Sequence, residues 1–179
     1  NMEKRLAMLV LAGAMVTSSL TGCGLKDSAT VATVAGDEIP AGLANFYARM
    51  TQAQYESMYS SYLGDNMWTR EVSEGKTYEK LVKDEVLKDL ENMYLLEDHM
   101  DDYKISLSDD EKKAIKDAAK EFSKDNDKDN KKKVSGDTEY VERYLTLVTI
   151  KQKMTDAIEA EVDTNVTDDE AKQKAMQYV

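Results

Sequence analysis

Residues 78–103 constrain the fold more than any other stretch of this chain. Apolar side chains recur there at steps of three or four residues, which matches the 3.6-residue turn of an α-helix. These positions are Tyr78, Val82, Val86, Leu90, Met93, Leu96, Met100 and Tyr103. Leu81, Leu87 and Tyr94 make the stripe wider than a coiled-coil seam. The spacing predicts one amphipathic helix, roughly 39 Å long, that packs against several partners.

The composition narrows the function classes. The 179 residues are 41% apolar and 33% charged with one proline, which suits a helical fold. The net charge of -11 argues against a nucleic-acid partner. The single cysteine excludes an internal disulfide, and His99, the single histidine, is too little for a histidine metal site or a Ser/His couple. We therefore predict no catalytic residue, no metal site and no cofactor.

The first 22 residues have the pattern of an export signal. Lys4 and Arg5 precede the apolar run 6–16, which is too short to span a bilayer. The run leads to Leu-Thr-Gly-Cys at 20–23, which resembles the lipobox of bacterial lipoproteins. The resemblance implies cleavage before Cys23 and acylation of its thiol, which would anchor the protein at the outer face of the cytoplasmic membrane. The alternative is a buried core cysteine. Residues 23–30 are expected to be the lipidated cysteine and a polar tether.

Residues 31–39 alternate apolar and polar side chains around Gly36 and Asp37, which predicts a hairpin with a Gly-Asp turn. Two short strands are only marginally stable alone, so the hairpin should dock on helices. Pro40 suits the first turn of a helix that ends at Gly64. We expect its inward face to carry Leu43, Phe46, Tyr47, Met50, Met58 and Tyr62.

Capping residues mark the next two helices. Thr77 is a plausible N-cap for the helix 78–103, after a loop that contains Gly75. Ser108 and Glu111 form a capping box. The helix that follows should bury Ile115, Ala118, Ala119 and Phe122.

The remaining residues predict a charged loop and two further helices. Residues 124–137 are almost free of apolar side chains, and 125–129 imitate the first ligands of a calcium loop. Because Asn130 and Gly136 occupy the positions that require glycine and glutamate, we expect a solvated loop. A helix over 138–162 should bury Val141, Tyr144, Leu145, Val148, Met154, Ile158 and Val162. Thr167 and Glu170 repeat the capping box and predict the start of a truncated helix within 166–179.

Several of these features together resemble the N-terminal chaperone domain of PrsA/SurA-type extracytoplasmic foldases. They are the lipobox at Cys23, the hairpin at 31–39, Phe46 and Tyr47 on the following helix, the long central helix, and the boundary at 105–111. The resemblance implies a mainly α fold with a small N-terminal β-hairpin, here a helical domain over 31–165. It also implies that unfolded secreted polypeptides are the partners. A homodimer remains open.

In that family a parvulin-type prolyl isomerase domain commonly follows the helical domain. Parvulin chemistry, as the family implies, uses a pair of histidines, and this chain contains only His99, which we expect at the surface. The alternatives are therefore the N-terminal part of a peptidyl-prolyl isomerase, or a lipoprotein adaptor or solute-binding module. Whether the full-length protein is an enzyme stays open.

A promiscuous binder of unfolded chains needs an adaptable apolar surface, which methionine and tyrosine supply. These residues gather within 50–68 together with the single tryptophan. We expect part of the cluster to line a cleft that faces the central helix, although any one such residue is more often core. The candidate peptide-binding residues are Phe46, Tyr47, Met50, Tyr55, Met58, Tyr59, Tyr62, Met67, Trp68, Met93 and Tyr94.

Overall fold

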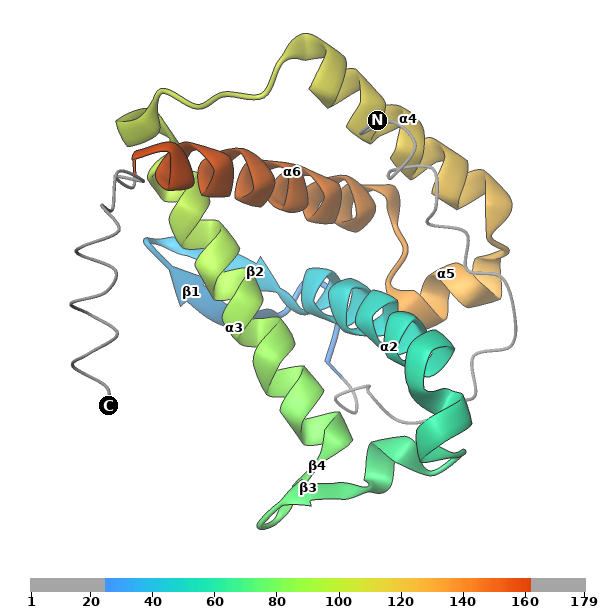
Figure 1. The fold of residues 1–179 in the computed structure, drawn as a ribbon. Coiled ribbons are helices and arrows are strands. Elements are labelled where there is room, and N and C mark those ends of the chain that lie inside the picture. The colour runs from blue at the N-terminus through green and yellow to red at the C-terminus, as the bar shows by residue number, and fades with distance from the viewer. Residues whose placement is uncertain (1–24, 162–179) are drawn as a thin grey trace, which may run out of the picture.

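The computed structural model describes residues 25–161 (Figure 1). The expected export signal, the anchor at Cys23 and the helix within 166–179 lie outside this range. The described part is mainly helical with a small N-terminal β-hairpin, as predicted. Its elements are β1 (Thr30–Val34), β2 (Asp37–Pro40), α2 (Ala41–Leu63), η1 (Met67–Thr69), β3 (Glu71–Ser73), β4 (Lys76–Thr77), α3 (Tyr78–Asp98), η2 (Met100–Tyr103), α4 (Asp109–Asp125), α5 (Lys128–Val134) and α6 (Thr138–Glu161).

Helices α2, α3 and α6 contact one another pairwise and enclose the main core, and α4 packs on α6 (Figure 1). Two groups of buried side chains result. One joins Leu43 of α2, Leu90 of α3 and Leu147 of α6 to the hairpin, and the other joins Phe46 to Phe122 of α4. Because three long helices share these cores, the apolar stripe on α3 is covered from several directions, as its width predicted.

The β1–β2 hairpin docks on α3, as expected. Ile39 is fully buried, and the hydroxyl of Tyr94 on α3 donates to the carbonyl of Glu38 over 3.3 Å. The turn lies one residue earlier than predicted, since Val34 pairs with Asp37 and the turn residues are Ala35 and Gly36. Both have positive φ, 50° and 89°, as a tight hairpin turn with the right twist requires.

Helix α3 begins where its cap predicted but ends earlier. Thr77 accepts a hydrogen bond from the backbone N–H of Lys80. The helix stops at Asp98 instead of continuing to Tyr103, and the 3-10 turn η2 follows. Glu97, Asp98, Asp101 and Asp102 place negative charge where the helix dipole is already negative, with no basic residue in the last turn. This accumulation of acidic residues is a physical reason for the early end.

The loop predicted at 124–137 is wrong, because it contains the helix α5. The side chain of Asp127 caps this helix by accepting from the N–H of Asn130. Val134 is buried against Phe122 and its neighbours in the second core group. Gly136 follows in a site where a Cβ would lie 2.8 Å from Phe122, so the close packing of this corner requires glycine.

The segment expected to be a polar tether up to residue 30 makes backbone hydrogen bonds from Lys26 onward. The carbonyls of Asp27 and Ala29 accept from the N–H groups of Gly42 and Ala41, over 2.8 and 2.7 Å. Helix α2 has no side-chain cap at Pro40, so these carbonyls satisfy donors that its first turn would otherwise leave without partners. The segment is part of the folded body.

The connection between α2 and α3 has more structure than predicted. It contains η1 and the short antiparallel pair β3–β4, where a loop was expected. Met67 and Trp68 of η1 are buried, and the indole N–H of Trp68 donates to Glu56 over 2.9 Å. This contact joins the segment between α2 and α3 to the C-terminal half of α2.

Candidate functional site

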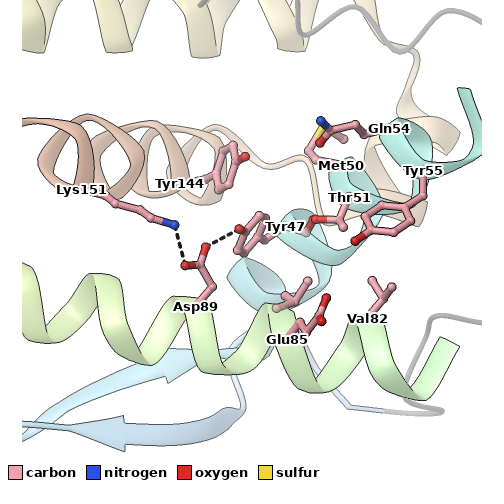
Figure 2. A pocket seen from close by; sticks show the side chains of 11 residues that line it. Tyr47, Met50, Thr51, Gln54, Tyr55, Val82, Glu85, Asp89, Tyr144 and Lys151 are labelled. Atoms are coloured by element: carbon pink, nitrogen blue, oxygen red, sulfur yellow. Dashed lines mark hydrogen bonds and ion pairs between the residues drawn. The ribbon is translucent and has the colours of Figure 1, made fainter. Parts of the chain in front are cut away.

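A cleft of about 370 Å³ lies where α2, α3 and α6 face one another (Figure 2). It is open to solvent on one side, and each of the three helices contributes one row of side chains. The lining residues are Tyr47, Met50, Thr51, Gln54 and Tyr55 of α2, Val82, Glu85, Val86 and Asp89 of α3, and Tyr144 and Lys151 of α6.

A hydrogen-bonded group centred on Asp89 closes one end of the cleft. The hydroxyl of Tyr47 donates to one carboxylate oxygen of Asp89, and the ammonium of Lys151 contacts the other over 2.6 Å (Figure 2). Burial raises the pKa of Tyr47, and the carboxylate of Asp89 raises it further. Tyr47 therefore remains a neutral donor at physiological pH, and one contact on each neighbouring helix fixes its ring.

Tyr144 forms the adjoining part of the wall. Its ring lies 5.1 Å from that of Tyr47 and 5.4 Å from that of Phe46, centroid to centroid. Burial, with a smaller contribution from Asp89, raises the pKa of Tyr144 to about 12. The two tyrosines thus present neutral aromatic surface to the cleft. Such rings offer large contact area with few torsions to restrict on binding.

The opposite end of the cleft is more acidic. Tyr55 lies there with Glu85, which is exposed. Burial raises the pKa of Tyr55, and the charge of Glu85 adds to the effect. Glu85 and Asp89 against Lys151 give the lining a net charge of -1. A positively charged or neutral guest is therefore favoured over an anionic one.

Apolar surface continues beyond the cleft along α2. Met58 and Tyr62 follow Tyr47, Thr51 and Tyr55 at steps of three or four residues, so they extend the same helix face. They are 51% and 83% exposed, although the sequence predicted that they point inward. Beside this half of α2 the core is formed by Met67 and Trp68, with Tyr55 and Leu63 packed against it, and Met58 and Tyr62 lie outside that contact.

Helix α6 extends the apolar surface on the other side. Val148 lies one turn from both Tyr144 and Lys151 on the same face. It is 40% exposed, so the prediction of an inward side chain is wrong. Leu147 and Ile150 are buried in its place. Val141, Leu145 and Met154 are buried as predicted, so the inward face of α6 is wider than predicted on one side and leaves Val148 exposed at the edge of the cleft.

The predicted peptide-binding residues separate into three groups. Tyr47, Met50 and Tyr55 line the cleft. Met58, Tyr59 and Tyr62 are exposed on the continuing face of α2, and the ring of Tyr59 lies 5.6 Å from that of Tyr55. The remaining five are buried and support the fold in this conformation: Phe46, Met67, Trp68, Met93 and Tyr94.

Sequence reasoning did not identify the polar half of the site. Thr51, Gln54, Glu85, Asp89 and Lys151 were not predicted as site residues. A signal was present on α3, because Asp89 follows Val82 and Val86 at helical spacing and precedes Met93 by four residues. An ionisable residue within an apolar stripe indicates a partner on another element.

Other chemistry has little support in the described part of the chain. Residues 25–161 contain no group of three or more His, Cys, Asp or Glu side chains placed to hold a metal ion. His99 is exposed, and its hydrogen bond to Asp102, 2.7 Å long, raises its pKa. Its position at the end of α3 matches the predicted surface placement.

The same range has no helix that is both long and apolar enough to cross a bilayer. Comparison of the chain with protein-family models, curated proteins and solved structures finds no match. Function is therefore inferred from the geometry of the cleft and from the sequence motifs.

Proposed function

We propose that this protein is a membrane-tethered chaperone or foldase module that binds unfolded, newly exported polypeptides in the cleft between α2, α3 and α6. The observation that carries the proposal is the continuity of apolar surface. Tyr47, Met50 and Tyr55 of the cleft wall are followed on the same face of α2 by the exposed side chains of Met58 and Tyr62. The export signal and the lipobox at Cys23 support a location at the outer face of the cytoplasmic membrane.

The dimensions of the cleft suit a short stretch of extended polypeptide. About 370 Å³ is near the lower end of the range for ligand pockets, so it accepts a few side chains and leaves the rest of a client outside. Those outer residues meet Met58, Tyr62 and Val148. Methionine adapts to side chains of different shape, which favours weak binding of many sequences.

Polar groups in the lining suit the backbone of an extended client. Thr51 and Gln54 lie between the aromatic residues, and the amide of Gln54 has both donors and an acceptor. An extended chain brings unpaired N–H and C=O groups that need partners wherever they leave water. The alternation of rings and polar groups along α2 supplies both kinds of contact.

Aggregation of a reduced, unfolded model protein tests the proposal. We expect the chain to slow aggregation without changing the rate of prolyl isomerisation, which separates the chaperone from the isomerase alternative. The double variant Met58→Ala, Tyr62→Ala should remain folded and protect less, because both side chains are largely exposed.

A matched control is available on other surfaces. Val72 of β3 and Leu95 of α3 are 39% and 44% exposed, and Leu95 lies on the side of α3 away from Val82 and Val86. The double variant Val72→Ala, Leu95→Ala should protect as well as the unchanged chain. Equal loss of protection in both double variants, or no protection by the unchanged chain, would exclude the cleft as the client site.

A further inference from the structure

Residues 112–133 carry more positive than negative charge, and their lysines are called the basic surface below. Nine lysines stand there against five acidic residues, a net of +4. The rest of the chain has 15 of the 24 basic and 30 of the 35 acidic residues, a net of -15. All but Lys131 of these lysines are exposed. The charge of residues 112–133 therefore differs in sign from that of the rest of the chain, although the first turn of α4 just before them is acidic, with Asp109, Asp110 and Glu111.

Two contacts bring these helices together as one surface. The ammonium of Lys131 donates to the carbonyl and hydroxyl of Ser123, over 3.2 and 3.1 Å, and so ties α5 to the last turns of α4. Phe122 and Val134 pack together in the same corner. The exposed lysines Lys124, Lys128, Lys132 and Lys133 are thus held on a single folded unit.

The basic surface lies beside the point where the chain leads back to Cys23. The hydroxyl of Ser135, directly after α5, donates to the carboxylate of Asp27 over 2.8 Å. Asn45 joins the same place by donating to Ser135 and to the carbonyl of Lys133. Cys23 precedes Asp27 by four residues, so the covalent chain keeps their Cα atoms within about 14 Å.

From these observations we infer that the basic surface rests on the anionic lipid headgroups of the membrane to which Cys23 is anchored. The inference depends on the lipid anchor of the proposed function. Helix α5 is about 10 Å long, so all its lysines lie close to the anchored end of the chain. At physiological ionic strength charges act over about 8 Å, so the lysines need to approach the headgroup layer closely, and their position on the side where the chain leads back to Cys23 favours this approach.

Charge complementarity selects a membrane over a soluble polyanion. A flat anionic surface attracts residues 112–133 and repels the rest of the chain, which has a net charge of -15. A nucleic acid or another long polyanion would extend past the basic surface along those acidic parts and be repelled there. The lysines therefore both strengthen the attachment and turn one side of the protein toward the bilayer.

Vesicle binding by the full 179-residue chain tests the inference, with Cys23→Ser so that no acyl group contributes. The test variant carries Lys124→Gln, Lys128→Gln, Lys132→Gln and Lys133→Gln. The control carries Arg70→Gln, Lys76→Gln, Lys80→Gln and Lys88→Gln, which are exposed residues outside the basic surface with the same total charge change. Vesicles of phosphatidylcholine with and without phosphatidylglycerol separate headgroup attraction from insertion of the signal segment, which all variants share.

Each lysine near an anionic surface contributes about fivefold to binding. We expect the test variant to bind phosphatidylglycerol vesicles at least about tenfold more weakly, with the control nearly unchanged and with equal binding of all proteins to pure phosphatidylcholine. Equal losses in test and control variants would overturn the inference, as would an unchanged test variant. Tighter lysine-dependent binding of inorganic polyphosphate than of phosphatidylglycerol vesicles would also overturn it.

The aggregation assay distinguishes this inference from the proposed function. The test variant should protect a client in solution as well as the unchanged chain, because the substituted lysines lie outside the cleft. If the unchanged chain gives no protection while its vesicle binding depends on the four lysines, the chaperone proposal fails and the membrane contact stands. If the unchanged chain protects the client but its vesicle binding does not depend on the four lysines, the membrane contact fails and the chaperone proposal stands.

Discussion

The contact between Tyr47 and Asp89 gives a quantitative test of the cleft. Tyr47→Phe removes the hydroxyl and leaves the ring in the wall. A hydrogen bond to a charged group contributes about 1.5 to 3 kcal/mol. We expect the lower end of this energy range, because the Asp89 side chain is 25% exposed to water and keeps Lys151 as a partner after the substitution. The variant should therefore lose about 1.5 kcal/mol of unfolding free energy near neutral pH.

The pH dependence makes the test sharper. Folding raises the pKa of Tyr47, so its contribution is complete below the unfolded value of about 10 and is lost as pH rises above it. Above about pH 10 the unfolded chain releases the Tyr47 proton while the folded protein retains it. The release of this proton from the unfolded chain lowers the unfolding free energy of the unchanged protein by about 1.4 kcal/mol by pH 11. Tyr47→Phe does not have this loss, so the two proteins should be about equally stable there.

Urea denaturation at about pH 8 and pH 11 measures both quantities, with the denaturant slope checked for constancy. Tyr62→Phe is the matched control, because Tyr62 is 83% exposed. It should differ from the unchanged protein by less than about 0.5 kcal/mol at both pH values. A stability gap for Tyr47→Phe that is absent near pH 8, or that is as large at pH 11, would refute the hydrogen bond and with it the fixed position of this ring.

Two further substitutions test the packing that holds the elements in place. Gly136→Ala should destabilise the fold by about 1 to 3 kcal/mol, because the added Cβ would lie 2.8 Å from Phe122 and 3.4 Å from the backbone of Lys131. Thermal unfolding measures this change in stability. A change below about 0.5 kcal/mol would contradict the close approach. Ser108→Ala should cost about 1 kcal/mol by removing the N-cap of α4, and unchanged stability in chemical denaturation would show that the cap does not contribute.

The helix starts were predictable from sequence because capping is local. Thr77 and Ser108 hydrogen-bond within their own first turns, as their spacing indicated. Helix α5 was not predictable in the same way. Its stability depends on Val134, one apolar side chain in a charged segment, which is buried by Phe122 from a different helix. A single residue produces no periodicity.

The candidate site was predictable only in part for a similar reason. The Met/Tyr composition of residues 50–68 indicated the correct region, but composition alone does not separate Tyr55, which lines the cleft, from Trp68, which is buried. The difference comes from Glu56, which accepts the indole N–H of Trp68 and lets the ring leave water. Lys151 joins Asp89 across 62 positions of sequence, a pairing that only the tertiary fold creates.

The backbone contacts of Asp27 and Ala29 have a mechanical consequence for the proposed lipid anchor at Cys23. Because these carbonyls accept hydrogen bonds from the first turn of α2, the folded body begins within four residues of Cys23. If Cys23 carries the proposed lipid anchor, so short a connection restricts how far the folded body can move from the bilayer and how it can rotate relative to it. Since α2 also carries Tyr47 and Tyr55 of the cleft, the proposed anchor would restrict the direction in which the cleft opens relative to the membrane.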